Sequence, residues 1–245
     1  MNHHFNDSPG QNIKLEPNRH PQWLSPLMRE IRSGNVNHTL EQSLEPMVPV
    51  NRTKQSAVLI LLQGEASASV LPKDASVLLT HRSPHLRAHS GQIAFPGGRI
   101  DPTDRNPVDA ALREAWEETG LNRATVTPLA QLPEVHIRVT GNPVHPIVAY
   151  RENLDGVGVV NPVEADAVFS VPIGELAAPE NRLVVSKGAW RGPAFRIRDY
   201  IIWGFTGGML NALLTHAGWD MPWDEDTYYD LAEMIAASRN NERHF

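Results

Sequence analysis

Residues 97–121 read GGRIDPTDRNPVDAALREAWEETGL, a segment in which a helix is marked at both ends. Asn106 is a favourable N-cap, and Pro107 suits the first helical position because its missing N–H would have no partner there. Gly120 stands where a left-handed residue would end the helix. The sequence therefore predicts a helix that begins after Asn106 and ends before Gly120.

Three glutamates give this predicted helix its chemical character. Glu114, Glu117 and Glu118 stand at i, i+3 and i+4, so their carboxylates share one face. Like charges at this spacing repel one another by a few tenths of a kcal/mol per pair. A hard divalent cation such as Mg²⁺ reverses that effect and can also bridge a diphosphate. Taken alone, however, such a trio is more often the solvated face of a surface helix.

The residues around the glutamates favour the metal site. Residues 113–121 (REAWEETGL) resemble the second half of the box of the Nudix hydrolases, G-x5-E-x7-R-E-U-x-E-E-x-G-U, in which U is a bulky apolar residue. Ala115 is smaller than usual at the first U. Counted from Gly98, the sixth residue is Asp104 instead of Glu, and eight residues separate it from Arg113 instead of seven. The role of Asp104 is therefore left open.

The resemblance implies a fold and a set of roles. It implies an α/β (α+β) fold, a Nudix-type α/β/α sandwich with a mixed sheet. Glu117 and Glu118 would be ligands of Mg²⁺ or Mn²⁺, and Glu114 would be a ligand or the base that activates water. Arg113 would orient the glutamates, and Gly98 would let the loop fold tightly against the helix.

Such families often use one more carboxylate from a later loop. Glu164 follows Asn161-Pro162-Val163 just before a predicted strand, and it is the candidate. An ordinary loop glutamate is an equally good interpretation. The eleven histidines are scattered, and we expect most of them to be solvated.

A second segment narrows the range of candidate substrates. Residues 78–98, LLTHRSPHLRAHSGQIAFPGG, resemble the signature of the coenzyme A pyrophosphatases, L-L-T-x-R-[SA]-x3-R-x3-G-x3-F-P-G-G. The similarity implies cleavage of coenzyme A to 3′,5′-ADP and 4′-phosphopantetheine. Arg82 and Arg87 would bind phosphate, since guanidinium groups bind it through two hydrogen bonds, and Gly97 and Gly98 would line the substrate site. Asn142-Pro143 departs from the family, which more often has Phe after the preceding glycine.

Two alternatives remain open. The same chemistry could act on ADP-ribose, NADH or another nucleoside diphosphate derivative. A Nudix-fold sensor could instead bind a nucleotide without cleaving it, although a pure binder has no need of three mutually repelling glutamates.

Composition excludes several other classes. The chain has 245 residues, a formal net charge of −6 and no cysteine, which removes disulfides, thiolate metal sites and a general basic field for nucleic acid. No apolar run approaches the roughly 20 residues of a membrane span. We expect a cytoplasmic protein that acts on a small molecule without nucleic acid or membrane partners, and a homodimer is compatible with the sequence.

The chain divides into an N-terminal extension, 1–50, partly disordered, and a domain, 51–245, with C-terminal helices. The resemblance implies that this domain is a Nudix hydrolase domain. In the extension we expect a mobile tail over 1–20, a short helix over 21–31 and a loop over 33–52. In the domain we expect strands at 57–62, 75–80, 126–135, 144–150, 167–171, 183–186 and 195–203, and closing helices near 207–216 and 226–238.

Overall fold

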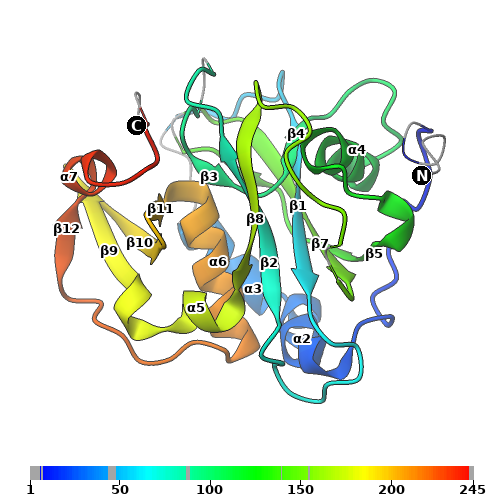
Figure 1. Cartoon of the computed structure of the whole chain (residues 1–245), viewed down its shortest axis with the longest axis horizontal. Helices are drawn as coiled ribbons and strands as arrows, with labels where there is room; N and C mark the ends of the chain where they lie inside the picture. The colour runs from blue at the N-terminus through cyan, green and yellow to red at the C-terminus, as the bar shows by residue number, and fades with distance from the viewer. Residues whose placement is uncertain are drawn as a thin grey trace.

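The computed structural model describes residues 6, 8–43, 48–86, 89–138, 140–153 and 155–242. A mixed sheet in the order β3–β2–β1–β7–β5 lies at its centre, where β4 also pairs with β1, β6 with β7 and β8 with β2 (Figure 1). β1 and β7 are parallel, whereas the other pairs of this sheet are antiparallel. The strands are β1 (Ser56–Gln63), β2 (Ser76–Arg82), β3 (Ile93–Ala94), β4 (Gly97–Arg99), β5 (Thr127–Gln131), β6 (Val135–His136), β7 (Pro143–Arg151) and β8 (Ala165–Pro172).

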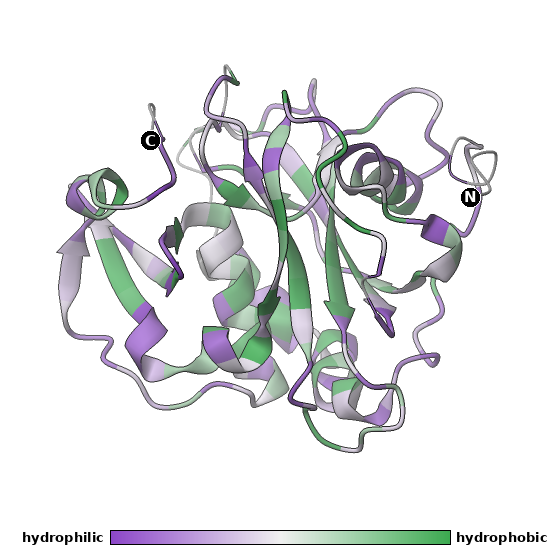
Figure 2. Cartoon of the chain, viewed as in Figure 1, coloured by the Kyte–Doolittle hydropathy of each residue, from purple (hydrophilic) through white to green (hydrophobic). Residues whose placement is uncertain are grey.

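The central strand β1 is buried on both faces, as its uninterrupted apolar run predicts. Ala57, Leu59 and Leu61 join the core beneath helix α4 (Pro107–Thr119). Ile60 and Leu62 point the other way, into the core formed with α2 (Ser25–Ser33), α3 (Asn35–Ser43) and α6 (Gly204–Ala217). The strands of this sheet are accordingly among the most hydrophobic parts of the chain (Figure 2). Helices on both faces of a mixed sheet confirm the expected α/β/α sandwich.

Helix α4 has the predicted ends. The Asn106 side chain accepts a hydrogen bond from the Asp109 N–H, Pro107 occupies the first turn, and Gly120 adopts φ +72° at the C-terminus. Asp109 continues into the core, where it forms a buried ion pair with Arg123 at 2.5 Å. Among the helices in the described ranges, none is long and apolar enough to cross a membrane.

A second sheet follows in the order β11–β10–β9–β12. The single strand expected over 195–203 is wrong, because Arg198 adopts φ +55° and the chain turns back as a hairpin. The helix expected over 226–238 is shorter, because residues 228–230 pair with β9 and Asp230 caps the helix only there. The elements are α5 (Ile173–Ala177), β9 (Arg182–Lys187), β10 (Trp190–Ile197), β11 (Tyr200–Ile202), β12 (Tyr228–Asp230) and α7 (Leu231–Ala236), with 3₁₀ turns η1 (Gln22–Leu24), η2 (Arg123–Thr125) and η3 (Pro179–Asn181).

The described part of the N-terminal region is more ordered than its composition suggests. The loop expected over 33–52 is wrong for 35–43, where α3 follows α2 after Gly34 at φ +82° and buries Val36 and Leu40. The described part of the predicted tail also contacts the domain, since the Gly10 N–H donates to Asp109 and the Asn12 amide to Arg123 O. The division of the chain at residues 50 and 51 stays a prediction.

Candidate active site

Arg113 is the centre of the hydrogen-bonding network on α4. Its Nε and Nη2 donate to the two oxygens of Asp104 at 2.9 and 3.0 Å. Nη1 donates to Glu114 Oε1 at 3.0 Å and to Glu117 Oε2 at 3.1 Å, and Nη2 also donates to the Arg99 carbonyl. These carboxylates raise the pKa of Arg113, chiefly through the hydrogen bonds to Asp104, so the guanidinium stays charged. One side chain thus fixes two members of the trio.

Glu118 is held separately, at the inner side of the helix. Its side chain is 5% exposed, Oε2 accepts the Gly97 N–H at 3.1 Å, and Oε1 lies 3.7 Å from Arg82 Nη1. Burial raises the pKa of Glu118 to about 7, against the opposing effects of Arg82 and the Gly97 N–H. A partly protonated carboxyl at neutral pH marks a position where a cation would be favourable.

Glu114 lies between the loop and the helix. Burial raises its pKa, and the negative charges of Glu117 and Glu164 add to the rise while Arg113 opposes it. The charge of Glu164 also raises the pKa of Glu118, so the exposed Glu164 side chain is close enough to act on the half-buried Glu114 and the buried Glu118. The geometry brings together all four carboxylates expected at this site, while their catalytic roles stay predictions.

The two glycines at the start of the box let this arrangement form. β4 pairs with β1 so that Gly97 faces Val58 and Gly98 faces Ala57. Gly97 has φ +159°, and a Cβ on it would overlap the Ala57 carbonyl oxygen. A Cβ on Gly98 would lie 2.5 Å from the Glu114 carboxylate. The loop therefore approaches both the sheet and the carboxylates more closely than any other residue type permits.

The upstream segment ends beside the same carboxylates. Arg82 is the last residue of β2 and contacts Glu118, as described above. The next residue, Ser83, donates its N–H to the Glu164 carbonyl at 2.9 Å, which ties the end of β2 to the loop before β8. Arg87, the second arginine expected to bind phosphate, lies outside the described residues.

Several histidines are buried or half-buried, which corrects the expectation that most are solvated. His81 is 2% exposed, with Nδ1 paired to Asp166 and Nε2 3.0 Å from the Asn240 carbonyl. His136 and His145 lie 3.2 and 3.8 Å from Glu134. The strand expected over 75–80 ended too early. A strand extended through His81 would have placed this side chain on the same buried face as Val77 and Leu79.

The carboxylates fit a hard divalent cation by their chemistry. The bonds from Arg113 use one oxygen each of Glu114 and Glu117, and the second oxygens remain for coordination. In the described ranges, no three His, Asp or Glu side chains are already arranged around a common metal position. Glutamate side chains have rotational freedom, so a cation could collect them from the places where Arg113 and Gly97 hold them.

The chain is similar to known proteins in sequence and in part of its structure. The family model described as the NUDIX domain matches residues 54–188. The uncharacterized Nudix hydrolase NudL of Shigella flexneri serotype 5b is 35% identical over 206 residues, which are 77% of this chain and 98% of NudL. NudL of Escherichia coli K12 is 36% identical over 177 residues, 67% of this chain and 83% of NudL. Among solved structures, the Nudix hydrolase RenU of M. smegmatis is 25% identical with a TM-score of 0.40, covering 50% of this chain and 73% of RenU.

Proposed function

The chain belongs to the Nudix family and is a pyrophosphohydrolase of nucleoside diphosphate derivatives, and we propose that its substrate is coenzyme A or a close derivative. The observation that carries the proposal is the segment 78–98. It contains the arginine and glycine pattern described above, and its Arg82 contacts Glu118. A substrate with a diphosphate and a separate 3′-phosphate requires such cationic groups in addition to a metal ion.

We assign Glu114, Glu117 and Glu118 as the groups that would hold Mg²⁺ or Mn²⁺. When bound, the ion would neutralise charge on the diphosphate and help to orient the attacking water. Arg113 keeps Glu114 and Glu117 on the correct side of the helix through its pairing with Asp104. Arg82 and Arg87 bind the phosphate oxygens and balance the negative charge that develops on them.

The reaction is an in-line displacement at one phosphorus of the diphosphate. Water forms a new P–O bond, and the P–O bond to the bridging oxygen breaks, so that the leaving phosphate takes that oxygen with its electron pair. Glu114 or Glu164 accepts the proton released by the water, since both are near enough to Glu118 for their charges to raise its pKa. The products are 3′,5′-ADP and 4′-phosphopantetheine.

A substrate panel tests the proposal. The purified chain is incubated with Mg²⁺ or Mn²⁺ and with coenzyme A, ADP-ribose, NADH or dGTP, and products are identified by mass. We expect 3′,5′-ADP mainly from coenzyme A. Preferred cleavage of another compound would reject coenzyme A while keeping Nudix chemistry, and binding without any turnover would favour the sensor.

A further inference from the structure

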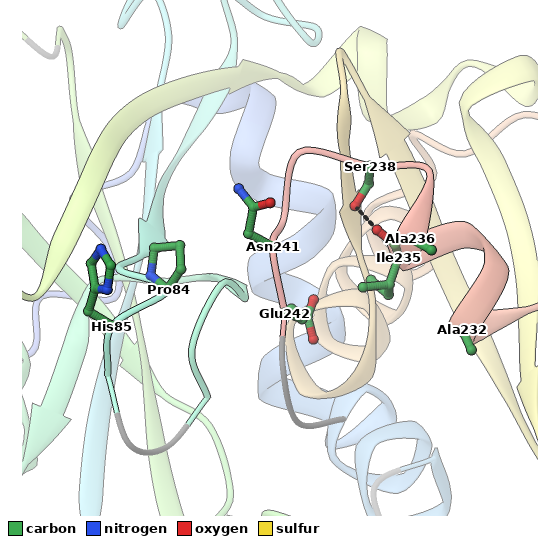
Figure 3. A pocket seen from close by; sticks show the side chains of 8 residues that line it. All are labelled: Pro84, His85, Ala232, Ile235, Ala236, Ser238, Asn241 and Glu242. Carbon is green, nitrogen blue, oxygen red and sulfur yellow. Dashed lines mark hydrogen bonds between the residues drawn. The ribbon is translucent and has the colours of Figure 1, made fainter.

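A cavity of about 560 Å³ lies between the loop that follows β2 and residues 232–242, here called the C-terminal segment. Pro84 and His85 line one side, Ala232 and Ala236 of α7 line the other, and residues 241–242 stand between them (Figure 3). Sites for small organic molecules typically have volumes of about 300–1,000 Å³. The cavity is therefore large enough for a substantial part of a ligand, and most of its far wall lies beyond the residues matched by the family model.

The cavity is next to the candidate active site along the chain. Pro84 comes two residues after Arg82, and two residues span at most about 7 Å. Arg82 itself lies 3.7 Å from Glu118. Ser83, between them, is hydrogen-bonded to the Glu164 loop. A ligand whose diphosphate lies at Arg82 and Glu118 would enter the cavity by passing around the end of β2, where Ser83 and Pro84 follow Arg82.

The lining suits an uncharged chain that carries both apolar groups and amides. Ala232, Ile235 and Ala236 present apolar surface, whereas Asn241 and Glu242 offer hydrogen-bonding groups. No lysine or arginine occurs among the described lining residues, and burial raises the pKa of Glu242. Among the described lining residues, a phosphate group would meet a carboxyl group and no cation, so this part of the lining disfavours it.

The wall formed by the C-terminal segment is fixed before any ligand arrives. The fully buried Asn240 accepts the Ile201 N–H and donates to the Ile201 carbonyl, both at 2.9 Å. Its own carbonyl lies 3.0 Å from His81 Nε2, on the strand that ends at Arg82. Gly91 packs so closely against Asn240 that a Cβ there would overlap its carbonyl oxygen. A preformed wall reduces the entropy lost on binding.

We propose that this cavity binds the pantetheine arm of coenzyme A, an inference that rests on the proposed function above. The arm is uncharged, contains two amides and a dimethyl group, and is attached directly to the diphosphate. The adenosine end carries the additional phosphate and therefore extends away from the cavity. The C-terminal segment thus selects the substrate by recognising the half of the molecule that ADP-ribose and NADH lack.

Filling the cavity tests this inference. Ala236→Trp places a large side chain on the exposed, cavity-facing surface of α7, and Ala237→Trp is the matched control, because Ala237 is exposed but does not line the cavity. We expect Ala236→Trp to lower kcat/KM for coenzyme A by about 10-fold or more, mainly through KM, and Ala237→Trp to stay within about 2-fold. Inhibition by 4′-phosphopantetheine should weaken in parallel, whereas inhibition by 3′,5′-ADP should not change.

The outcomes separate the two proposals. If the unaltered chain does not cleave coenzyme A, the proposed function fails and this inference fails with it. If the unaltered chain cleaves coenzyme A and Ala236→Trp has the same KM, only this inference is overturned. An equal loss of inhibition by both products would also overturn it, because it would indicate general damage to the site. Ala232→Trp, one turn earlier on the same face, repeats the test, and thermal unfolding verifies that each variant is folded.

Discussion

Asp104 and Arg113 form a two-point ion pair, with Nε 2.9 Å from Oδ1 and Nη2 3.0 Å from Oδ2. The Asp104 side chain is only 2% exposed, so the pair is shielded from solvent. Arg113 in turn contacts Glu114 and Glu117. The residue whose place in the box departs from the general pattern is thus the anchor for the arginine that holds two carboxylates.

Replacing Asp104 should therefore impair catalysis without unfolding the chain. In Asp104→Asn, one acceptor becomes an N–H donor that faces the guanidinium, so Arg113 loses its fixed orientation. We expect kcat to fall by about 10-fold and the melting temperature to drop, with the chain still folded at the assay temperature, because one partner of a shielded ion pair loses its charge. Asp101→Asn is the matched control, since Asp101 is half-exposed and lies 4.0 Å from Arg113. Equal activity of the two variants would show that the pair does not position the site.

Gly98→Ala should disturb Glu114 directly. The added Cβ would lie 2.5 Å from the Glu114 carboxylate, which must then move away from the loop. We expect kcat/KM to fall by about 10-fold or more, because a displacement of about 1 Å in an active site has effects of this size. Gly174→Ala is the control, as a Cβ there meets nothing within 4 Å. Steady-state kinetics on both variants measures kcat/KM, and a fully active Gly98→Ala would contradict the role given to Glu114.

Glu118→Gln should nearly abolish turnover. The amide keeps the shape of the side chain but loses the charge assigned to metal binding, and we expect turnover to fall by roughly 10²-fold or more with the fold retained. The measurement is product formation at saturating Mg²⁺ or Mn²⁺, with circular dichroism as the test of folding. Near-normal turnover would refute the assignment of Glu118 as a metal ligand.

The same residue should make the metal-free protein less stable as the pH rises. Burial raises the pKa of Glu118 to about 7 from an ordinary value of 4.5. Between these values the folded chain binds a proton that the unfolded chain has released, so the free energy of unfolding falls with rising pH. The loss is complete above about pH 7 and amounts to roughly 3 kcal/mol at most. Urea unfolding with chelator should show Glu118→Gln to be the more stable protein at pH 8, with a difference that shrinks toward pH 4.5.

Local sequence was sufficient for α4, its caps and the common face of its glutamates, because each depends on residues within a few positions of one another. Contacts distant in sequence were not predictable in this way. Asp166 and Asn240 surround His81 from 85 and 159 residues away, and no local pattern connects them. The strand expected over 195–203 failed for a local reason, since Arg198 is an unusual residue at positive φ and Asp199 is the only turn-forming residue beside it.

The C-terminal segment is likewise held by contacts distant in sequence, which could not be predicted. Asn240→Ala tests how much these contacts contribute to stability. Asn240 is fully buried and makes two hydrogen bonds to Ile201 and one of 2.8 Å to Glu242. Alanine would leave buried groups of Ile201 unsatisfied, so we expect a loss of about 2–4 kcal/mol in the free energy of unfolding. The exposed Asn18 provides the control, and Asn18→Ala should cost less than about 0.5 kcal/mol.

Urea denaturation of Asn240→Ala and Asn18→Ala measures the difference between their free energies of unfolding. The position of Asn240 beside His81 adds a second expectation, because a loosened segment no longer forms the fixed wall of the cavity. KM for coenzyme A should therefore rise in Asn240→Ala at temperatures where it is still folded, while kcat changes less, since the carboxylates on α4 are untouched. A cost no larger than that of Asn18→Ala would mean that the segment is held by its apolar contacts and not by Asn240.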